Sequence, residues 1–277
     1  MNKILVYAMT FGFLSEAPNA RAEDLADSKP QFSVGLKAWN SSWLSYLPTV
    51  INVNGGASTA SFVDAVEGDQ RTTLLPVLAV RYKNYFISSS YARYSSNFSV
   101  PHSINQTGEL TSRSDHIARN ETDLTAGYYL MENIAITAGY KYGVETRDSS
   151  LGITPGVSSH LYDVTVKGLL FGAFANFPIQ GGLRSYWQLG YGPTRVNISF
   201  PPASANAPIN VHGSYQIGEI GLVYALPLDR LSMTGANVGL GYRSQTLKSR
   251  SRAPYSADPR NYRDVKDGVI LSLNVSF

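Results

Sequence analysis

The feature that most constrains the fold is an alternation of apolar and polar residues that recurs along almost the whole chain. In the final stretch, "DGVILSLNVSF", Val269, Leu271, Leu273, Val275 and Phe277 occupy every second position, and mostly small or polar residues separate them. A period of two is typical of a β-strand with two different faces. The segments with this pattern are 31–43, 72–83, 85–98, 117–130, 134–146, 160–177, 183–199, 211–226, 231–247 and 263–277. We therefore predict an all-β fold of about ten strands. The number of strands would be eight or twelve if a long connection contains two further strands or if one strand has been divided wrongly.

The connections between these segments alternate in length. Four are short and rich in turn-forming residues: "KN", "MEN", "PIQGG" and "PLDR". The other five are long and polar: 44–71, 99–115, 147–159, 201–210 and 248–261. Segregation of short turns and long loops to opposite ends is typical of a single transmembrane antiparallel up-and-down β-barrel, with both chain ends on the short-turn side. The long connection 44–71 could also fold into the barrel.

The composition supports strands and excludes several function classes. Charged residues make up 16% of the chain, against about 25% in soluble proteins, and tyrosine contributes 18 residues. The net charge of +3, without a basic run that interleaves with aromatic residues, argues against a nucleic-acid partner. Because the chain has no cysteine, disulfides and thiolate metal sites are impossible.

The N-terminus has the pattern of a secretory signal. Lys3 precedes an apolar run from Ile4 to Leu14, and "ARA" ends at Ala22. We predict a signal peptide over 1–22, a short periplasmic leader over 23–30 and a barrel over 31–277. No other stretch is long and apolar enough to predict a transmembrane helix.

The two faces of each strand predict which residues line the lumen, because a spanning barrel needs an apolar exterior and tolerates a polar interior. In segment 160–177, for example, Val164 and Val166 are expected outside, and Asp163 and Lys167 inside. The predicted lumen-lining charges are Lys37, Arg81, Arg119, Glu121, Asp123, Lys141, Glu145, Asp163, Lys167, Arg184, Glu219, Arg243, Asp264 and Lys266. They allow two interpretations: a cross-strand network of ion pairs that fills a narrow barrel, or a narrow pore with a mild preference for anions.

Aromatic residues cluster in two sets along the predicted strands. One set lies near the short turns: Tyr82, Tyr85, Phe86, Tyr128, Tyr129, Phe174, Phe177, Tyr224 and Phe277. The other lies toward the long loops: Trp39, Trp43, Tyr46, Tyr140, Tyr142, Tyr191, Phe200 and Tyr242. We interpret the two sets as interfacial girdles of a membrane barrel.

The signal sequence, the alternating strands and the terminal strand together resemble a Gram-negative outer-membrane β-barrel protein. Leu271, Leu273, Val275 and Phe277 match the C-terminal signal that the barrel-assembly machinery reads in that class. The resemblance implies location in the bacterial outer membrane, with outer-membrane lipid and lipopolysaccharide as partners. The arginine-rich connection 248–263 could contact lipopolysaccharide phosphates.

Catalysis has little support in the sequence. The chain is similar in strand number to the omptin proteases, but it contains neither an Asp-x-Asp nor an Asp-x-His pattern. His212 and Ser214 share a face, as in outer-membrane lipid A deacylases, but Glu219 joins them only if Gly218 forms a bulge, and we expect His212 to face the lumen.

We therefore predict no catalytic residue, metal site or cofactor. The expected role is that of a narrow pore or a structural or surface protein with long extracellular loops. The alternatives are a ligand-binding or adhesive barrel that acts through its outer loops, and a lipid A-modifying hydrolase that uses His212 and Ser214.

Overall fold

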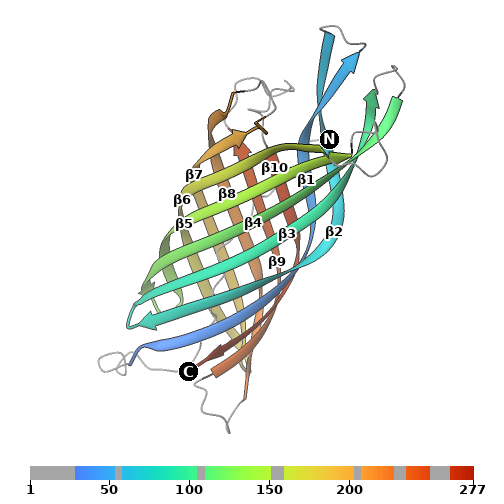
Figure 1. The fold of residues 1–277 in the computed structure, drawn as a ribbon. Helices are drawn as coiled ribbons and strands as arrows, with labels where there is room; N and C mark the ends of the chain where they lie inside the picture. The colour runs from blue at the N-terminus through green and yellow to red at the C-terminus, as the bar shows by residue number, and fades with distance from the viewer. Residues whose placement is uncertain are drawn as a thin grey trace, which may run out of the picture.

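The computed structural model is a closed antiparallel barrel of ten strands (Figure 1). It describes residues 29–53, 58–104, 110–150, 159–202, 207–227, 235–249 and 263–277. The predicted signal peptide and most of the leader therefore lie outside the described residues. The strands are β1 Gln31–Val53, β2 Ser58–Tyr82, β3 Tyr85–Ile104, β4 Leu110–Met131, β5 Ile134–Ser150, β6 Ser159–Gln180, β7 Leu183–Ser199, β8 Ile209–Leu226, β9 Gly235–Ser249 and β10 Arg263–Ser276.

The barrel closes where the first strand pairs with the last. Val34 lies opposite Val275, and the backbones of Phe32 and Phe277 exchange two hydrogen bonds. Each strand otherwise pairs with its neighbours in sequence, so every described strand has a partner on both sides. This confirms the predicted all-β barrel with ten strands.

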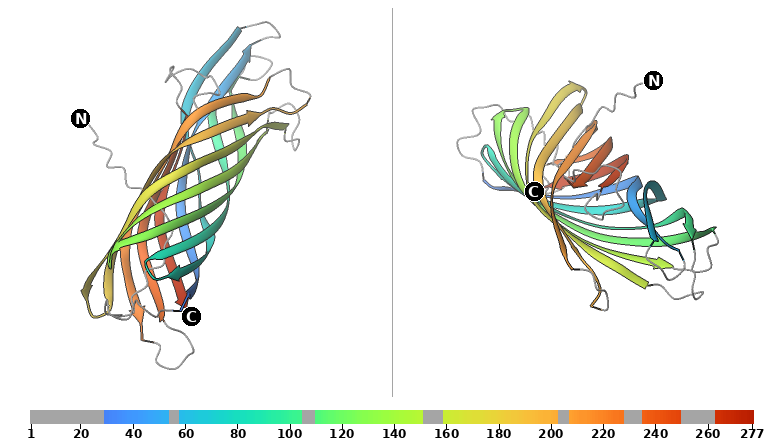
Figure 2. Two further views of the ribbon diagram at one scale, coloured as in Figure 1. Left: turned by 90° about the vertical axis from the view of Figure 1, so that its left-hand side faces the viewer. Right: turned by 90° about the horizontal axis from the view of Figure 1, so that it is seen from above.

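The stagger of the strands sets the width of the barrel. The row of paired residues that starts at Trp43 returns to β1 at Gln31, twelve residues nearer the N-terminus. The row runs through Lys266, Gln245, Ile217, Gly190, Gly172, Thr137, Gly127, Phe86 and Arg81. Ten strands with this stagger tilt by about 40° and enclose a backbone cylinder of roughly 10 Å radius. Figure 2 shows the tilt from the side. Side chains from opposite walls can meet across such a lumen.

Short turns gather at the end of the barrel that holds the C-terminus (Figure 1). β2 and β3 are joined by Lys83 and Asn84, and Lys83 has a φ of 53°. β6 and β7 are joined by Gly181 and Gly182, with φ of 58° and 83°. Tight hairpins require positive φ at such positions, and glycine adopts it without strain.

The predicted long connection 44–71 is mostly strand. β1 and β2 stay paired far beyond the barrel wall, as far as Val53 opposite Ser58. Figure 2 shows this hairpin projecting at the end away from the short turns. The expectation that this segment could fold into the lumen is therefore wrong for the described residues: the two strands satisfy each other's backbone groups outside it.

The β2–β3 ladder is the least regular in the barrel wall. Backbone pairing stops after Val77 and Ser90 and resumes only at Gly68 and Phe98. Pro76, which has no N–H to donate, lies at the start of this interruption. Farther out, the side chains of Ser96 and Asn97 donate hydrogen bonds to Asp69 across this interruption.

No helix among the described residues is long and apolar enough to cross a membrane.

The exterior of the barrel is apolar between two aromatic bands. The outward side chains of the C-terminal strand, Leu271, Leu273 and Phe277, are about half exposed. One band, near the short turns, exposes Tyr82, Tyr85, Phe177, Tyr224 and Phe277, and the other exposes Tyr91, Tyr140, Tyr142, Tyr191 and Tyr242. Several aromatic residues assigned to the bands face the lumen instead. Trp39, Trp43, Phe86 and Phe174 are buried there, and Tyr129 and Phe200 pack against the buried apolar cluster.

Candidate functional site

The centre of the lumen holds an ion-pair cluster built on Glu219 of β8. Lys37 donates a hydrogen bond of 2.7 Å to Glu219 Oε1, and the Tyr186 hydroxyl donates another of 2.9 Å to the same atom. Arg243 lies 3.6 Å from the other carboxylate oxygen, and its guanidinium stacks 4.8 Å above the Trp39 ring centroid. Four strands thus meet at one carboxylate, which balances the buried cations around it.

A second network joins β4, β5 and β10 nearer the outer end. Arg119 donates a hydrogen bond of 2.9 Å to Asp264 and forms ion pairs with Glu121 and Glu145 at 2.7 and 3.5 Å. Lys141 lies 2.8 Å from both Glu121 and Asp123. Further contacts come from Arg147, Gln245 and Tyr215. This network ties three strands of the wall together across the lumen.

Lys266 of β10 is held by aromatic rings. Its Nζ atom lies 3.6 Å from the ring centroid of Trp43 and 3.5 Å from that of Tyr94. Trp39 packs edge-on against the Tyr94 ring at 5.9 Å. Cation–π contacts of this kind stabilise a buried ammonium group.

The charged groups of the lumen are packed away from solvent. Eleven charged residues inside the barrel are only 1–3% exposed, six of them cations and five anions: Lys37, Asp115, Arg119, Glu121, Lys141, Glu145, Arg147, Glu219, Arg243, Asp264 and Lys266. A water-filled channel would leave such side chains in contact with solvent. Six cations and five anions agree with an ion-pair network of nearly balanced charge.

Three further predicted lumen charges lie inside but are less buried. Asp123 accepts a hydrogen bond from Lys141 and is partly exposed. Arg81 and Arg184 lie at the short-turn end, where Arg81 stacks 4.5 Å above the Tyr129 ring. Arg184 donates hydrogen bonds to the side chains of Asn176 and Asn133 at 2.9 and 3.2 Å. The two arginines therefore line the short-turn mouth of the barrel.

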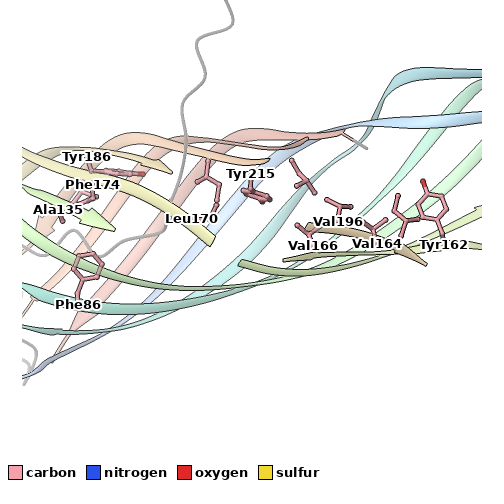
Figure 3. Packing of buried hydrophobic residues seen from close by; sticks show 14 residues of the cluster. Phe86, Ala135, Tyr162, Val164, Val166, Leu170, Phe174, Tyr186, Val196 and Tyr215 are labelled. Atoms are coloured by element: carbon pink, nitrogen blue, oxygen red, sulfur yellow. The ribbon is translucent and has the colours of Figure 1, made fainter. Parts of the chain in front are cut away.

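The prediction for β6 is wrong: Asp163 and Lys167 lie on the outer surface. Lys167 is exposed, and the Asp163 side chain is 42% exposed, while Val164, Val166 and Leu170 are buried inside. Figure 3 shows Val164 and Val166 beside Val196 of β7 and Tyr162. The part of the lumen wall formed by β6 and β7 is therefore apolar. β6 lies beside β5 of the charged network and across the barrel from β1. The polar residues of β6 face outward beyond the tyrosine band.

Sequence reasoning missed several lumen residues. Asp115 and Arg147 lie just beyond the predicted ends of their strands, at 117 and 146, and the longer observed strands bring them inside. Trp39 and Trp43 were assigned to a girdle, although they alternate in step with Lys37. Residues an even number of positions apart on a strand share a face, and this spacing from Lys37 was the signal that could have placed both tryptophans in the lumen.

His212 and Ser214 lie on the opposite face of β8 from Glu219. β8 pairs without a register shift on both sides, so Gly218 forms no bulge. His212 and Ser214 face outward, contrary to our expectation, and Tyr215 faces the lumen. Glu219 faces the lumen and is bound to Lys37. Within the described residues no group of His, Cys, Asp and Glu side chains forms a metal site.

Comparison with known proteins supports the architecture. No family model and no curated sequence matches the chain. The outer-membrane protease OmpT from Escherichia coli is similar in structure, with a TM-score of 0.51 over 91% of this chain and 99% of that chain, at 9% sequence identity. The translocator domain of the autotransporter NalP from Neisseria meningitidis gives a TM-score of 0.44, with 8% identity and 92% coverage of both chains.

The class follows from the closed barrel and its exterior. Ten tilted strands with an apolar outer face between two aromatic bands define an outer-membrane β-barrel protein, and such a surface is stable only in a lipid bilayer. The similarity to OmpT is a similarity of fold alone.

Proposed function

We propose that this protein is a closed, non-conducting barrel that serves as a structural or surface protein of the outer membrane. The observation that carries the proposal is the burial of eleven charged side chains in the lumen. Their ion pairs join strands of the wall to one another, so charged groups that could solvate a passing ion are engaged with each other instead. The parts available to partners are then the extracellular ends of the strands and the long β1–β2 hairpin.

The proposal does not extend to catalysis. OmpT is a protease, but its similarity to this chain is one of fold, and the acidic and histidine patterns of omptins do not occur in this sequence. A lipid hydrolase would need an acid beside His212 and Ser214, whereas Glu219 lies on the opposite face of the sheet and is bound to Lys37.

We also propose that the barrel-assembly machinery reads the C-terminal strand. The residues that support this are Leu271, Leu273, Val275 and Phe277, which share the outward face of β10. Because Phe277 ends a strand that closes the barrel against β1, a machinery that binds this strand could hold it until closure.

Ion leakage from proteoliposomes tests whether the lumen is closed. Vesicles that contain the wild-type protein should lose potassium no faster than protein-free vesicles. Trp39→Ala removes the buried ring beneath Arg243 and should increase the leak, since it hollows the middle of the lumen. Trp187→Ala is the matched control, because Trp187 is half exposed on the outer face and its loss leaves the lumen intact. A wild-type leak well above the protein-free rate would contradict the proposal.

A further inference from the structure

Four basic residues form a row on the outer face of β6–β9. Lys167 lies opposite Arg195, and Arg195 lies opposite His212, on three successive strands. Lys248 lies opposite Ser214, two residues along β8 from His212. All four side chains are exposed and point away from the lumen. We call these residues the basic row.

The basic row lies just beyond the outer tyrosine band. Tyr142 is the partner of Lys167 in the sheet, and the Lys167 Nζ atom lies 5.5 Å from the centroid of its ring. Tyr191 precedes Arg195 by four positions on the same face of β7 and is exposed. Because tyrosine bands mark the boundary between the apolar core and the head groups, the basic row lies at the depth of the outer head groups.

Among the described residues, no carboxylate pairs with a side chain of the basic row. Asp163, the outward acid of β6, is bound by His160 at 3.3 Å and by Thr146 at 2.9 Å. On the opposite side of the barrel the outward Arg71 does have a partner, since Asp69 lies 3.5 Å away.

We propose that the basic row binds the phosphate groups of the phosphorylated glycolipid in the outer leaflet, that is, of lipid A. The Arg195 guanidinium matches the geometry of a phosphate, and Lys167 and Lys248 supply flanking ammonium groups. The His212 ring supplies a further N–H donor. The exposed tyrosines and leucines below the row contact the acyl chains of the same lipid. This inference rests on the membrane location, and it holds whether or not the lumen conducts.

Binding of lipid A to the full-length purified barrel in detergent tests the inference. The probes are diphosphoryl lipid A and the same lipid with both phosphates removed, so that the acyl chains are constant. The wild-type protein should bind the phosphorylated lipid at least about tenfold more tightly, and the preference should weaken with salt. The variant with Lys167→Gln, Arg195→Gln, His212→Gln and Lys248→Gln should lose this preference.

Matched variants keep the test specific. Arg71→Gln combined with Arg93→Gln removes two exposed cations from the other side of the barrel and should leave the preference unchanged. If the fourfold variant fails to fold, Arg195→Gln alone should reduce the preference several-fold, and Arg195→Lys should keep part of it. Equal binding of the two lipids by the wild type, or equal losses in the Arg71 and Arg93 variant, would overturn the inference.

Discussion

Strands β10 and β6 have the same sequence pattern but turn opposite faces to the lumen. In β10 the polar positions face inward, as with Asn274, which donates a hydrogen bond of 3.0 Å to Asn237. In β6 the polar positions Asp163 and Lys167 face outward, and the apolar positions Val164 and Val166 are buried in the lumen.

The difference teaches that alternation identifies two faces without saying which one is inside. The exterior of a membrane barrel is apolar only between the aromatic bands, and beyond the outer band it contacts head groups and water. β6 satisfies this rule: its outward positions are apolar at Leu169 and Phe171 and polar at Lys167 and Asp163. A polar residue at the depth of the apolar band therefore indicates the lumen face, whereas a polar residue beyond the outer band can lie on either face.

The largest expected effect on stability is a difference between two lysines, Lys37 and Lys167, which the sequence analysis placed in the lumen together. Lys37→Ala leaves the Glu219 carboxylate buried without its closest cation, and we expect a loss of about 3–5 kcal/mol in the free energy of unfolding. Lys167→Ala removes an exposed lysine and should change it by no more than about 0.5 kcal/mol. Urea unfolding in lipid vesicles measures both changes.

The triple variant Lys37→Met, Glu219→Gln and Arg243→Met checks the cause of that loss. Because it removes the carboxylate together with both cations around it, it should recover most of the stability that Lys37→Ala loses. Similar losses for Lys37→Ala and Lys167→Ala would mean that the two lysines share one environment, and the contrast between inward polar positions and the outward polar positions of β6 would fail.

The second expected effect compares outward positions at two depths. Leu271→Arg places a charge in the apolar band of β10 and should destabilise the barrel by about 2–4 kcal/mol. Thr165→Arg places the same charge on the outer face of β6 beyond the tyrosine band, where the cost should be about 0–1 kcal/mol. Unfolding in the same vesicles compares them, and a large loss for Thr165→Arg would place this part of β6 in lipid.

The third expected effect, for Phe277, is small on stability and larger on assembly. Phe277→Ala should change the stability of the purified barrel by no more than about 1 kcal/mol, but it should lower the amount assembled in cells several-fold. Phe171→Ala, also an exposed phenylalanine on the outer face, is the control and should assemble normally. Quantifying the folded, heat-modifiable form in membranes measures both variants. Equal assembly of the two would remove Phe277 from the assembly signal.

Much of the architecture was predictable because short-range rules dictate it. Turn residues such as Gly181 and Gly182, together with alternation in segments such as 117–130 and 263–277, were enough for the strand number and for closure. Strand length beyond the membrane was not predictable, since no lipid imposes a pattern there. The β1–β2 hairpin was therefore mistaken for a loop.

The lumen was predictable where charged residues lie at the depth of the apolar band, and not where they lie beyond it, as Asp163 and Lys167 do. Glu121 and Lys141 indicate an interior position, because placing an unpaired charge in lipid costs much free energy. The apolar wall, with Val166 and Leu170, looks like a lipid-facing surface in sequence, and tertiary packing alone places it inside. Trp39 was misplaced for the same reason, since a tryptophan suits a girdle as well as a packed lumen.

The most direct test of the account is the conductance of the wild-type barrel in a planar lipid bilayer. If the ion-pair clusters around Glu219 and Glu121 fill the lumen, insertion of the protein should produce no discrete current steps at moderate voltage and salt. Reproducible unitary steps from the wild-type protein would show a continuous aqueous path and would contradict the closed barrel.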